Sequence, residues 1–255
     1  MNELLRVEDL FVRYRGAAVS TLKGVSLTVA PGERVALVGE SGSGKSTLAR
    51  ALLGLAPVVG GRVVFQGRQV LSAEEKLQDR EYRRRVQMIF QDPYNSLHPR
   101  LNVKANLLEP LKIHGLYNPM QSAADCAQVL EKVGMDPQSV SRYPRQFSGG
   151  QLQRLGIARA LLMKPLLLLA DEPVSALDVS VQAQVLNLLA ELSAQAQLAL
   201  LFISHDLAVV RHLCDRVAVM LKGELVESGP VEQVCFEPQH PYTQKLVLCQ
   251  SLEFG

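Results

Sequence analysis

The sequence predicts one α/β domain with a mostly parallel β-sheet, a strand-rich N-terminal part and an inserted helical subdomain. Short apolar runs alternate with amphipathic helical segments, a pattern typical of a parallel sheet covered by helices. Residues 5–38 read as short strands broken by turns. Residues 92–147 are polar, show helical periodicity and contain six prolines, which marks them as an insertion of different character. In such a fold, functional residues gather at the carboxyl ends of the parallel strands.

Composition and charge are those of a globular protein and argue against several classes of function. The 255 residues are 47% hydrophobic and 20% charged, which suits one large domain or a core with an inserted subdomain. The formal net charge of +2 gives no reason to expect wholesale binding of nucleic acid or anionic lipid. Tryptophan is absent and aromatic residues make up only 5%, which argues against a base-stacking platform.

Three features predict a cytoplasmic protein. The four cysteines are scattered without a CxxC pair, as is typical of reduced thiols. The first ten residues, MNELLRVEDL, lack the basic flank and apolar block of a signal peptide. The apolar runs at 166–170 and 198–203 are far too short to cross a bilayer. We therefore expect a protein that is made and kept in the cytoplasm and that reaches a membrane only by docking to a partner.

Local patterns place the individual elements. Strands are expected at 4–14, 24–30, 33–39, 61–67, 86–91, 166–171, 198–204 and 217–221. A helix should follow the third strand, with an apolar face formed by Leu48, Ala51, Leu52 and Leu55. Two later helices, at 179–197 and 207–213, alternate with the last strands and should cover the sheet.

The segment GESGSGKS at residues 39–46 fits the pattern G-x-x-x-x-G-K-[ST] and lies between a predicted strand and a predicted helix. Glycines let the backbone wrap so that its N–H groups converge on phosphate oxygens, and the helix adds its positive N-terminus. The strand–loop–helix context argues against a plain glycine-rich turn. The expected nucleotide-binding residues are Gly39, Glu40, Ser41, Gly42, Ser43, Gly44, Lys45, Ser46 and the adjacent Thr47.

Two roles can be assigned within this loop from chemistry alone. Lys45 can neutralise charge on the β- and γ-phosphates, and the Ser46 hydroxyl can be a ligand to Mg²⁺. A second segment, LLLLADE, ends a fully apolar strand with two carboxylates. Asp171 suits Mg²⁺, and Glu172 suits the orientation or deprotonation of an attacking water. A strand end alone would also explain Asp-Glu, but the phosphate loop favours the catalytic interpretation.

The segment FSGGQ at residues 147–151 predicts a capped helix. Ser148 reads as the N-cap, and the helix should continue through QLQRLGIARALL to Lys164-Pro165. The exposed N–H groups at this helix start form a second anion site. The N–H groups concerned are those of Ser148, Gly149 and Gly150, and Gln151 completes the segment as an expected binding residue. By itself the segment would favour a plain capped helix, and the other segments favour the binding interpretation.

Together these segments resemble the nucleotide-binding cassette of ABC proteins over nearly the whole chain. The elements occur in order as Tyr14, GESGSGKST, Gln91 in IFQDP, FSGGQ, LLLLADEP, SALD at 175–178, and His205 in ISHD. The resemblance implies a P-loop NTPase fold with a RecA-like core, an N-terminal antiparallel β subdomain and an inserted helical subdomain. It also implies an ATPase that uses ATP and Mg²⁺.

The resemblance assigns roles that the residues alone do not. Tyr14 should stack on the adenine ring, and Gln91 should sense the γ-phosphate and join Ser46 and Asp171 at Mg²⁺. His205 should hold the γ-phosphate and position Glu172, so that Glu172, His205 and Gln91 form the catalytic set. Asp178 should shape the loop that crosses to a partner cassette.

One copy of each motif implies a working dimer, because the family places FSGGQ against ATP held by the opposite cassette. Two ATP molecules would then be sandwiched at the interface. The departures from the family pattern are Phe147, Ala170 and Val174. None of them removes a charge or a donor, so we expect hydrolysis to be intact.

Two further segments, QDPYNSLHPRLNV and EPQHPYTQKLV, resemble the oligopeptide/dipeptide/nickel importer branch. The resemblance implies an ATP-hydrolysing subunit that powers uptake of peptides or nickel from the cytoplasmic face of the membrane. Its partners would be a second, different cassette, two permease subunits that contact residues 91–107, and an external solute-binding protein. The chain ends at Gly255, soon after HPYT, which favours shorter, nickel-type cassettes.

The main alternative is a soluble accessory ATPase of a carbon–phosphorus lyase-type complex, which shares HPYT-like tails and acts without permeases. DNA-repair members need a long coiled coil before the signature, translation-type members carry two cassettes, and a P-loop kinase has no use for FSGGQ, SALD or ISHD. Within the single cassette 1–255, we expect an ATP-binding core at 1–91 and 156–235. A helical subdomain with the signature should span 92–155, and a C-terminal tail 236–255.

Overall fold

The computed structural model describes residues 3–251 and contains two β-sheets. Residues 1–2 of the expected core and 252–255 of the expected C-terminal tail lie outside the described residues. The first sheet has the order β2-β1-β4-β5 and pairs β1 with β2, β1 with β4 and β4 with β5, all antiparallel. Its strands are β1 (Leu5–Val12), β2 (Leu22–Val29), β4 (Val58–Phe65) and β5 (Arg68–Ser72). This sheet confirms the expected antiparallel N-terminal part.

The second sheet has six strands in the order β10-β9-β3-β8-β7-β6 and is parallel except at one edge. Its strands are β3 (Arg34–Val38), β6 (Val86–Ile89), β7 (Leu167–Asp171), β8 (Ala199–Ile203), β9 (Arg216–Leu221) and β10 (Glu224–Pro230). Only β10 runs antiparallel, to β9. The central β3 is paired on both sides, so the segment that follows it lies in the middle of the sheet's carboxyl edge.

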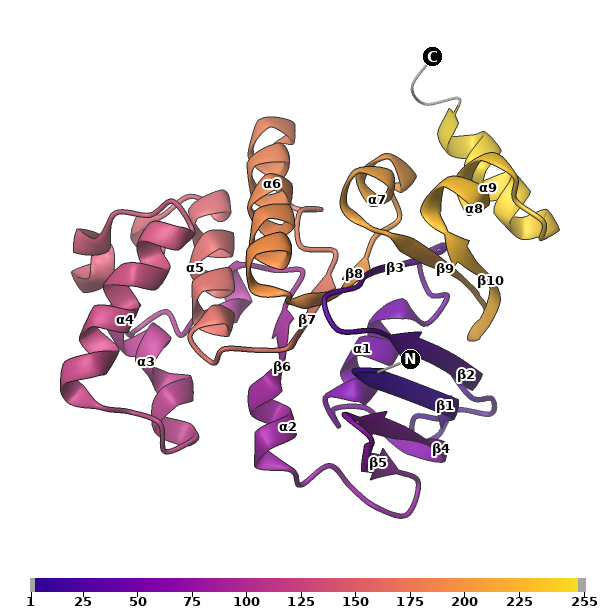
Figure 1. Ribbon diagram of the computed structural model, residues 1–255, viewed down its shortest axis with the longest axis horizontal. Helices are drawn as coiled ribbons and strands as arrows, with labels where there is room; N and C mark the ends of the chain where they lie inside the picture. The colour runs from indigo at the N-terminus through magenta and orange to yellow at the C-terminus, as the bar shows by residue number, and fades with distance from the viewer. Residues whose placement is uncertain (1–2, 252–255) are drawn as a thin grey trace.

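Helices cover both faces of the larger sheet. The helices within residues 3–251 are α1 (Lys45–Leu52), α2 (Arg80–Arg85), α3 (Val103–Ile113), α4 (Pro119–Lys132), α5 (Gly149–Leu161), α6 (Val179–Ala196), α7 (Leu207–Leu213), α8 (Val231–Phe236) and α9 (Pro241–Ser251). Short 3-10 turns lie at Tyr94–Ser96, Pro137–Ser141 and Pro144–Gln146. Figure 1 shows α3, α4 and α5 grouped on one side of the molecule and the antiparallel sheet on the other.

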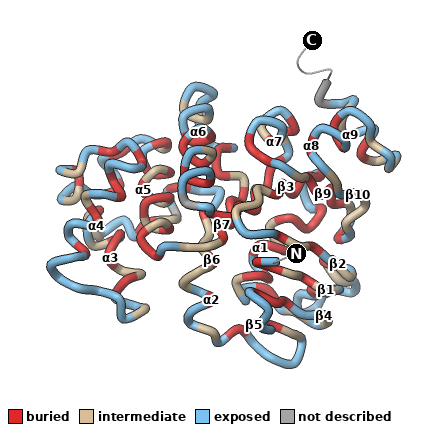
Figure 2. The backbone as a smooth tube through the Cα atoms, viewed as in Figure 1, coloured by how far each residue is buried: buried red, intermediate tan, exposed pale blue. Residues whose placement is uncertain are grey.

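The larger sheet separates two hydrophobic cores because successive side chains of a strand point to opposite faces. In β3, Val35 and Leu37 belong to the core shared with α1 and the antiparallel sheet. Ala36 and Val38 belong to the core shared with α5, α6 and α7. Figure 2 shows the buried residues concentrated along these central strands. Burial on both faces explains why β3, β7 and β8 read as continuous apolar runs in the sequence.

Some elements differ from the expectations. The helix after the phosphate loop ends at Leu52, and Leu55 lies beyond it with 63% of its surface exposed, so its place on the helix's apolar face was wrong. The strands β5 and β10 and the helices α2, α8 and α9 were not expected. None of the helices within residues 3–251 combines the length and apolar character that a membrane span requires. All four cysteines are free thiols.

Candidate nucleotide-binding site

The predicted phosphate loop joins the carboxyl end of β3 to α1, in the context that the motif requires. Three glycines have positive φ, with values of 148° at Gly39, 80° at Gly42 and 112° at Gly44. A Cβ atom on Gly39 would lie 2.2 Å from the Met220 carbonyl oxygen of the neighbouring β9. A side chain at Gly39 would therefore push the loop away from the sheet edge.

Lys45 and Ser43 point polar groups into this loop. Lys45 is 5% exposed, and its Nζ donates to the Gly39 and Glu40 carbonyl oxygens at 2.7 and 2.9 Å. Burial lowers the pKa of Lys45, because the charged ammonium loses its hydration. The negative charges of Glu172, Asp171 and Glu40 oppose this shift in part. The Ser43 hydroxyl is buried and finds no hydrogen-bond partner among the described residues. A buried cation and an unused donor suit an anionic ligand in this loop.

Asp171 is the last residue of β7 and lies against the start of α1. The Ser46 Oγ donates to Asp171 Oδ1 at 2.8 Å, so the expected hydroxyl and carboxylate are adjacent. Burial raises the pKa of Asp171, and the hydrogen bond from Ser46 opposes that rise. The surroundings of Asp171 thus disfavour its charged form. A cation bound next to the carboxylate would instead favour the charged form.

Glu172 follows with a backbone that few non-glycine residues adopt. Its φ is 44°, and its N–H donates to the Ile203 carbonyl at 3.1 Å, which anchors it to the end of β8. Two side chains converge on Glu172 Oε2: the Gln91 Nε2 donates at 3.3 Å, and the His205 Nδ1 lies 3.7 Å away. The structure therefore brings together the three side chains that the sequence places in the catalytic set. Left-handed backbone is costly for a non-glycine residue, and the bond to Ile203 helps to hold it here.

The signature segment forms the N-terminus of α5. Ser148 is the N-cap, and its Oγ accepts from the Gln151 N–H at 3.4 Å while Gln151 Oε1 accepts from the Ser148 N–H at 3.0 Å. This reciprocal pair is a capping box, and it confirms the predicted cap. In Figure 1, α5 and α1 lie on opposite sides of β6 and β7. Within one chain, the two predicted anion sites are thus separate.

Of the remaining expected residues, Tyr14 and Asp178 are exposed and Thr47 is half-buried. Tyr14 follows β1 in a turn and is 39% exposed, and its carbonyl accepts from the Ala17 N–H at 3.1 Å. Asp178 is the N-cap residue of α6 but makes no capping hydrogen bond with its side chain. Thr47 lies in the first turn of α1. Tyr14 and Asp178 are therefore accessible to a ligand or to a second chain.

A side chain that makes a hydrogen bond to the phosphate loop was missed. The Tyr242 hydroxyl accepts from the Glu40 N–H at 2.9 Å, which connects α9 to the second residue of the loop. The sequence contained the signal in HPYT, where Tyr242 is the third residue, but that motif was interpreted only as a family marker. Nothing in its spacing indicates a contact with a loop 202 residues away.

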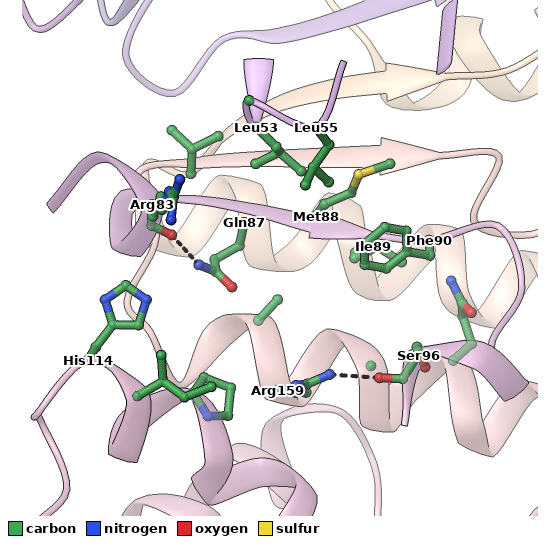
Figure 3. A pocket seen from close by; sticks show the side chains of 17 residues that line it. Leu53, Leu55, Arg83, Gln87, Met88, Ile89, Phe90, Ser96, His114 and Arg159 are labelled. Carbon is green, nitrogen blue, oxygen red and sulfur yellow. Dashed lines mark hydrogen bonds between the residues drawn. The ribbon is translucent and has the colours of Figure 1, made fainter. Parts of the chain in front are cut away.

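A groove of about 390 Å³ lies between the sheet and the helical part of the chain. Leu55, Met88 and Phe90 contribute to one wall, and His114 lies on the opposite side (Figure 3). Its neighbour Ile113 also lines the groove. Leu55 and Ile113 are 63% and 65% exposed, so the groove offers apolar surface at its mouth. Burial lowers the pKa of His114, and the charges of Arg80, Arg84 and Arg83 lower it further. These arginines lie on α2, and Arg83 lines the groove, so α2 forms a basic rim next to it.

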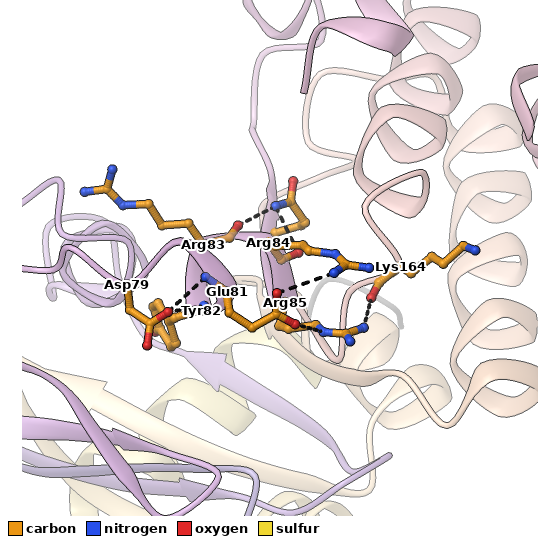
Figure 4. A network of polar contacts seen from close by, with 8 residues as sticks. Asp79, Glu81, Tyr82, Arg83, Arg84, Arg85 and Lys164 are labelled. Carbon is orange, nitrogen blue, oxygen red and sulfur yellow. Dashed lines mark hydrogen bonds and ion pairs between the residues drawn. The ribbon is translucent and has the colours of Figure 1, made fainter. Parts of the chain in front are cut away.

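The basic rim belongs to α2, which is fixed on several sides (Figure 4). Asp79 caps the helix by accepting from the Glu81 and Tyr82 N–H groups at 2.9 and 3.0 Å. Arg85 pairs with Glu81 at 2.7 Å and donates to the Lys164 carbonyl at 3.0 Å. The fully buried Tyr82 donates its hydroxyl to the Leu52 carbonyl at 2.9 Å. The rim is therefore held to both α1 and the turn before β7.

Comparisons with known proteins agree with this geometry. The family model described as ABC transporter matches residues 22–175. The chain is 49% identical over 255 residues to the probable peptide ABC transporter ATP-binding protein y4tS of Sinorhizobium fredii, covering 96% of this chain and 72% of that protein. It is 50% identical over 254 residues to the glutathione import ATP-binding protein GsiA of Escherichia coli, covering 96% of this chain. The chain spans only 40% of the length of GsiA.

Solved structures show the same fold. The chain matches cbiO1 from Clostridium perfringens, part of the ABC transporter complex cbiONQ, with a TM-score of 0.81 and 25% identity over all of both chains. It matches the ATP-binding cassette MJ0796, solved as a dimer bound to ADP and phosphate, with a TM-score of 0.78 and 27% identity. That match covers 89% of this chain and 98% of the other. The chain belongs to the ABC transporter family, as an ATP-binding and ATP-hydrolysing cassette.

Proposed function

We propose that this cassette powers the import of peptides. One observation carries the proposal: the chain is 49–50% identical, over 96% of its length, to relatives named for peptide transport and glutathione import. The segments QDPYNSLHPR and HPYT support the same branch of the family. These relatives favour an importer over the accessory ATPase of a carbon–phosphorus lyase-type complex, so that alternative is set aside. Nickel stays a prediction from the sequence and serves as a comparison cargo.

The geometry supports a defined role for each residue that would contact ATP. Backbone N–H groups of residues 41–47 would surround the phosphates, with the Ser43 hydroxyl adding a donor, while the Glu40 N–H stays bonded to Tyr242. Lys45 would exchange the Gly39 and Glu40 carbonyls for phosphate oxygens, a favourable exchange because it pairs a buried cation with an anion. Tyr14 would stack on adenine, since its ring is exposed and a stacked aromatic contributes roughly 1–3 kcal/mol.

A divalent cation fits next to this loop. The Ser46 hydroxyl and the Asp171 carboxylate are already adjacent, and the Gln91 amide lies on the same side through its contact with Glu172. Hydroxyl, carboxylate and amide oxygens are the ligands that Mg²⁺ prefers. When bound, Mg²⁺ would neutralise charge on the phosphates of ATP.

Glu172 would orient and deprotonate the attacking water. Its carboxylate is held by the Gln91 amide and lies beside His205, which limits its movement without neutralising it. Such assistance contributes roughly 10²–10⁴ in rate. His205 would hold the γ-phosphate and keep Glu172 in place, and Gln91 would pass the state of the site to the residues that follow it.

A second cassette would complete the site. The helix start at Ser148–Gln151 and the loop at 39–46 are separate within this chain, so each needs a partner surface to share one ATP. We propose that the partner is a different chain and that Asp178, exposed at the start of α6, lines the interface. Two permease subunits and an external solute-binding protein would complete the importer.

The groove between the sheet and the helical part is the proposed permease site. It lies next to residues 91–107, and a permease segment in it would contact both parts of the chain at once. Contact of this kind would keep the chain peripheral, at the cytoplasmic face of the membrane. We also propose the division into a core at 1–91 and 156–235, a helical subdomain at 92–155, and a tail from 236, with α5 running across position 155.

Uptake by cells that lack this chain tests the proposal. Labelled dipeptides, tripeptides, glutathione and nickel would be supplied to the deletion strain, with and without the chain restored. We expect peptide or glutathione uptake to be lost and to return with the wild-type chain but not with Lys45→Ala, because that variant lacks the phosphate-binding cation. Unchanged peptide uptake, or purification of the chain with soluble enzymes and no permease, would contradict the proposal.

A further inference from the structure

The C-terminal segment is hydrogen-bonded to the phosphate loop. The Tyr242 hydroxyl accepts from the Glu40 N–H at 2.9 Å, across 202 residues of sequence. Tyr242 belongs to α9, which has no role in the proposed reaction. Glu40 is the second residue after the end of β3, directly following Gly39. The contact therefore joins an element outside the motifs to the point where the loop begins.

A chain of hydrogen bonds places the Tyr242 ring. Glu227, on β10, accepts from the Gln239 N–H at 2.8 Å and from the His240 N–H at 3.0 Å. The His240 Nδ1 in turn accepts from the Tyr242 N–H at 3.1 Å. The ring is partly buried and packs against the hydrophobic core to which α7 and α8 also contribute. The segment HPYT is thus built as a turn that starts α9 and directs a tyrosine hydroxyl to the loop.

Glu40 is held from two sides. Its carbonyl accepts from Lys45 Nζ at 2.9 Å and from the Ser43 N–H at 3.2 Å, and its N–H donates to Tyr242. The Lys45 ammonium donates to the Glu40 carbonyl and also to the Gly39 carbonyl. It cannot keep both bonds at full strength once it binds phosphate oxygens. Tyr242 makes its bond with the N–H, which that exchange leaves untouched. The tyrosine bond is then a restraint from outside the loop that stays on this residue while ATP enters, next to the turn bond from the Ser43 N–H within the loop.

We propose that Tyr242 is a positioning residue that holds the first turn of the phosphate loop in its ATP-binding shape. The inference rests on the proposed role of residues 39–47 in holding phosphate. It gives the HPYT segment a physical task within the nucleotide site, because loss of one restraint leaves a more flexible loop that must be ordered by the ligand. A tyrosine that only attached α9 to the core would affect stability and leave nucleotide affinity unchanged.

Tyr242→Phe tests the proposal, because it removes the hydroxyl and keeps the ring that packs on the core. We expect amide exchange at Glu40 to become faster and the Kd for both ATP and ADP to rise roughly two- to tenfold, as suits one hydrogen bond. The kcat at saturating ATP should change less than about twofold, since bound ligand restores the loop. Tyr117→Phe, which removes a hydroxyl from the distant end of the helical part, is the matched control and should change none of these values.

A second variant keeps the test decisive. His240→Ala removes the acceptor that holds the Tyr242 backbone. We expect the Kd for ATP and ADP to rise in this variant too, but by less than in Tyr242→Phe. Wild-type Glu40 exchange and wild-type nucleotide affinity in Tyr242→Phe would overturn the inference. A fall in Tm with unchanged affinity would also overturn it, by assigning Tyr242 to packing alone. Lys45→Ala separates the proposed role of Tyr242 from the proposed phosphate site. Normal ATP binding by Lys45→Ala would contradict the phosphate site itself.

Discussion

At the scale of single residues, the end of β7 places two acids where the fold itself does not favour them. Asp171 is 4% exposed, and burial raises its pKa against the opposing hydrogen bond from Ser46. Glu172 holds a φ of 44°, a conformation that costs a non-glycine residue of order 1 kcal/mol or more. Both costs fall on residues proposed for the chemistry of ATP. A trade of stability for function is therefore expected at this strand end.

Asp171→Asn should stabilise the ligand-free protein at neutral pH. Because folding raises the pKa of Asp171, the folded state favours the protonated acid, and the stability that the acid contributes falls as the pH rises through the folded pKa. Asparagine removes this dependence and still accepts from Ser46. We expect a gain on the order of 1 kcal/mol, or roughly 2–4 °C in Tm, measured by thermal unfolding without nucleotide.

The pH dependence provides the control for this prediction. The gain should shrink as the pH falls below the pKa of Asp171, since the wild-type acid is then protonated as well. The same variant should lose most of its Mg²⁺-dependent ATP hydrolysis. A lower Tm at neutral pH, or a gain that grows towards acid pH, would show that burial does not penalise this carboxylate.

At the scale of elements, the signature segment depends on how closely α5 approaches α6. A Cβ atom on Gly150 would lie 2.2 Å from Val181 Cγ1, so the two helices meet where only glycine fits. The contact joins the N-terminus of α5, which carries the capping box, to the start of α6, which follows the SALD segment. Two predicted nucleotide-site segments are thus fixed against each other by packing.

Gly150→Ala should destabilise the chain by about 1–3 kcal/mol, because Val181 is stiff and cannot move its methyl group away cheaply. Adding Val181→Ala should recover most of this loss, since it removes the clashing atom. Denaturant unfolding of the two single variants and the double variant gives the coupling energy directly. Additive effects, with no recovery in the double variant, would mean that the helices do not constrain each other here.

Much of the fold could be predicted because its central elements carry their own signals. The apolar runs of β7 and β8, buried on both faces, predicted strands, and Ser148 predicted the cap of α5. The strand β10 could not be predicted, because only two of its seven residues are hydrophobic and its place depends on pairing with β9. Helix α2 is six residues long and depends on the Asp79 cap and on contacts that Arg85 makes far along the chain.

The candidate site shows the same division between local and long-range information. The phosphate loop lies within one short segment, so its pattern predicts its shape. The grouping of Gln91, Glu172 and His205 needed the family resemblance, because strand order and not sequence distance brings them together. Tyr242 was missed as a site residue because a single hydroxyl on a distant helix leaves no periodic signal.

At the scale of the whole molecule, the groove between the sheet and the helical part should couple the ATP site to a permease. Ile113→Glu places a charge in the apolar mouth of the groove, where a docked segment would have to desolvate it. We expect permease subunits to be lost when this variant is purified from membranes, while its Tm and its affinity for ATP stay at wild-type values.

Met120→Glu is the matched control for this experiment. Met120 is 89% exposed on α4 and does not line the groove, so the same charge there should leave permease association intact. Equal losses in both variants would indicate a general effect of negative charge on membrane recovery. Wild-type recovery of permeases with Ile113→Glu would place the docking surface elsewhere.

The central claim is that Glu172 completes an ATP site that this chain shares with a second cassette. Phosphate release by Glu172→Gln at saturating Mg²⁺-ATP tests it most directly. We expect the rate to fall at least about 100-fold, because glutamine cannot take a proton from water, while ATP binding and ATP-driven pairing of cassettes persist. A rate near that of the wild type would contradict the account.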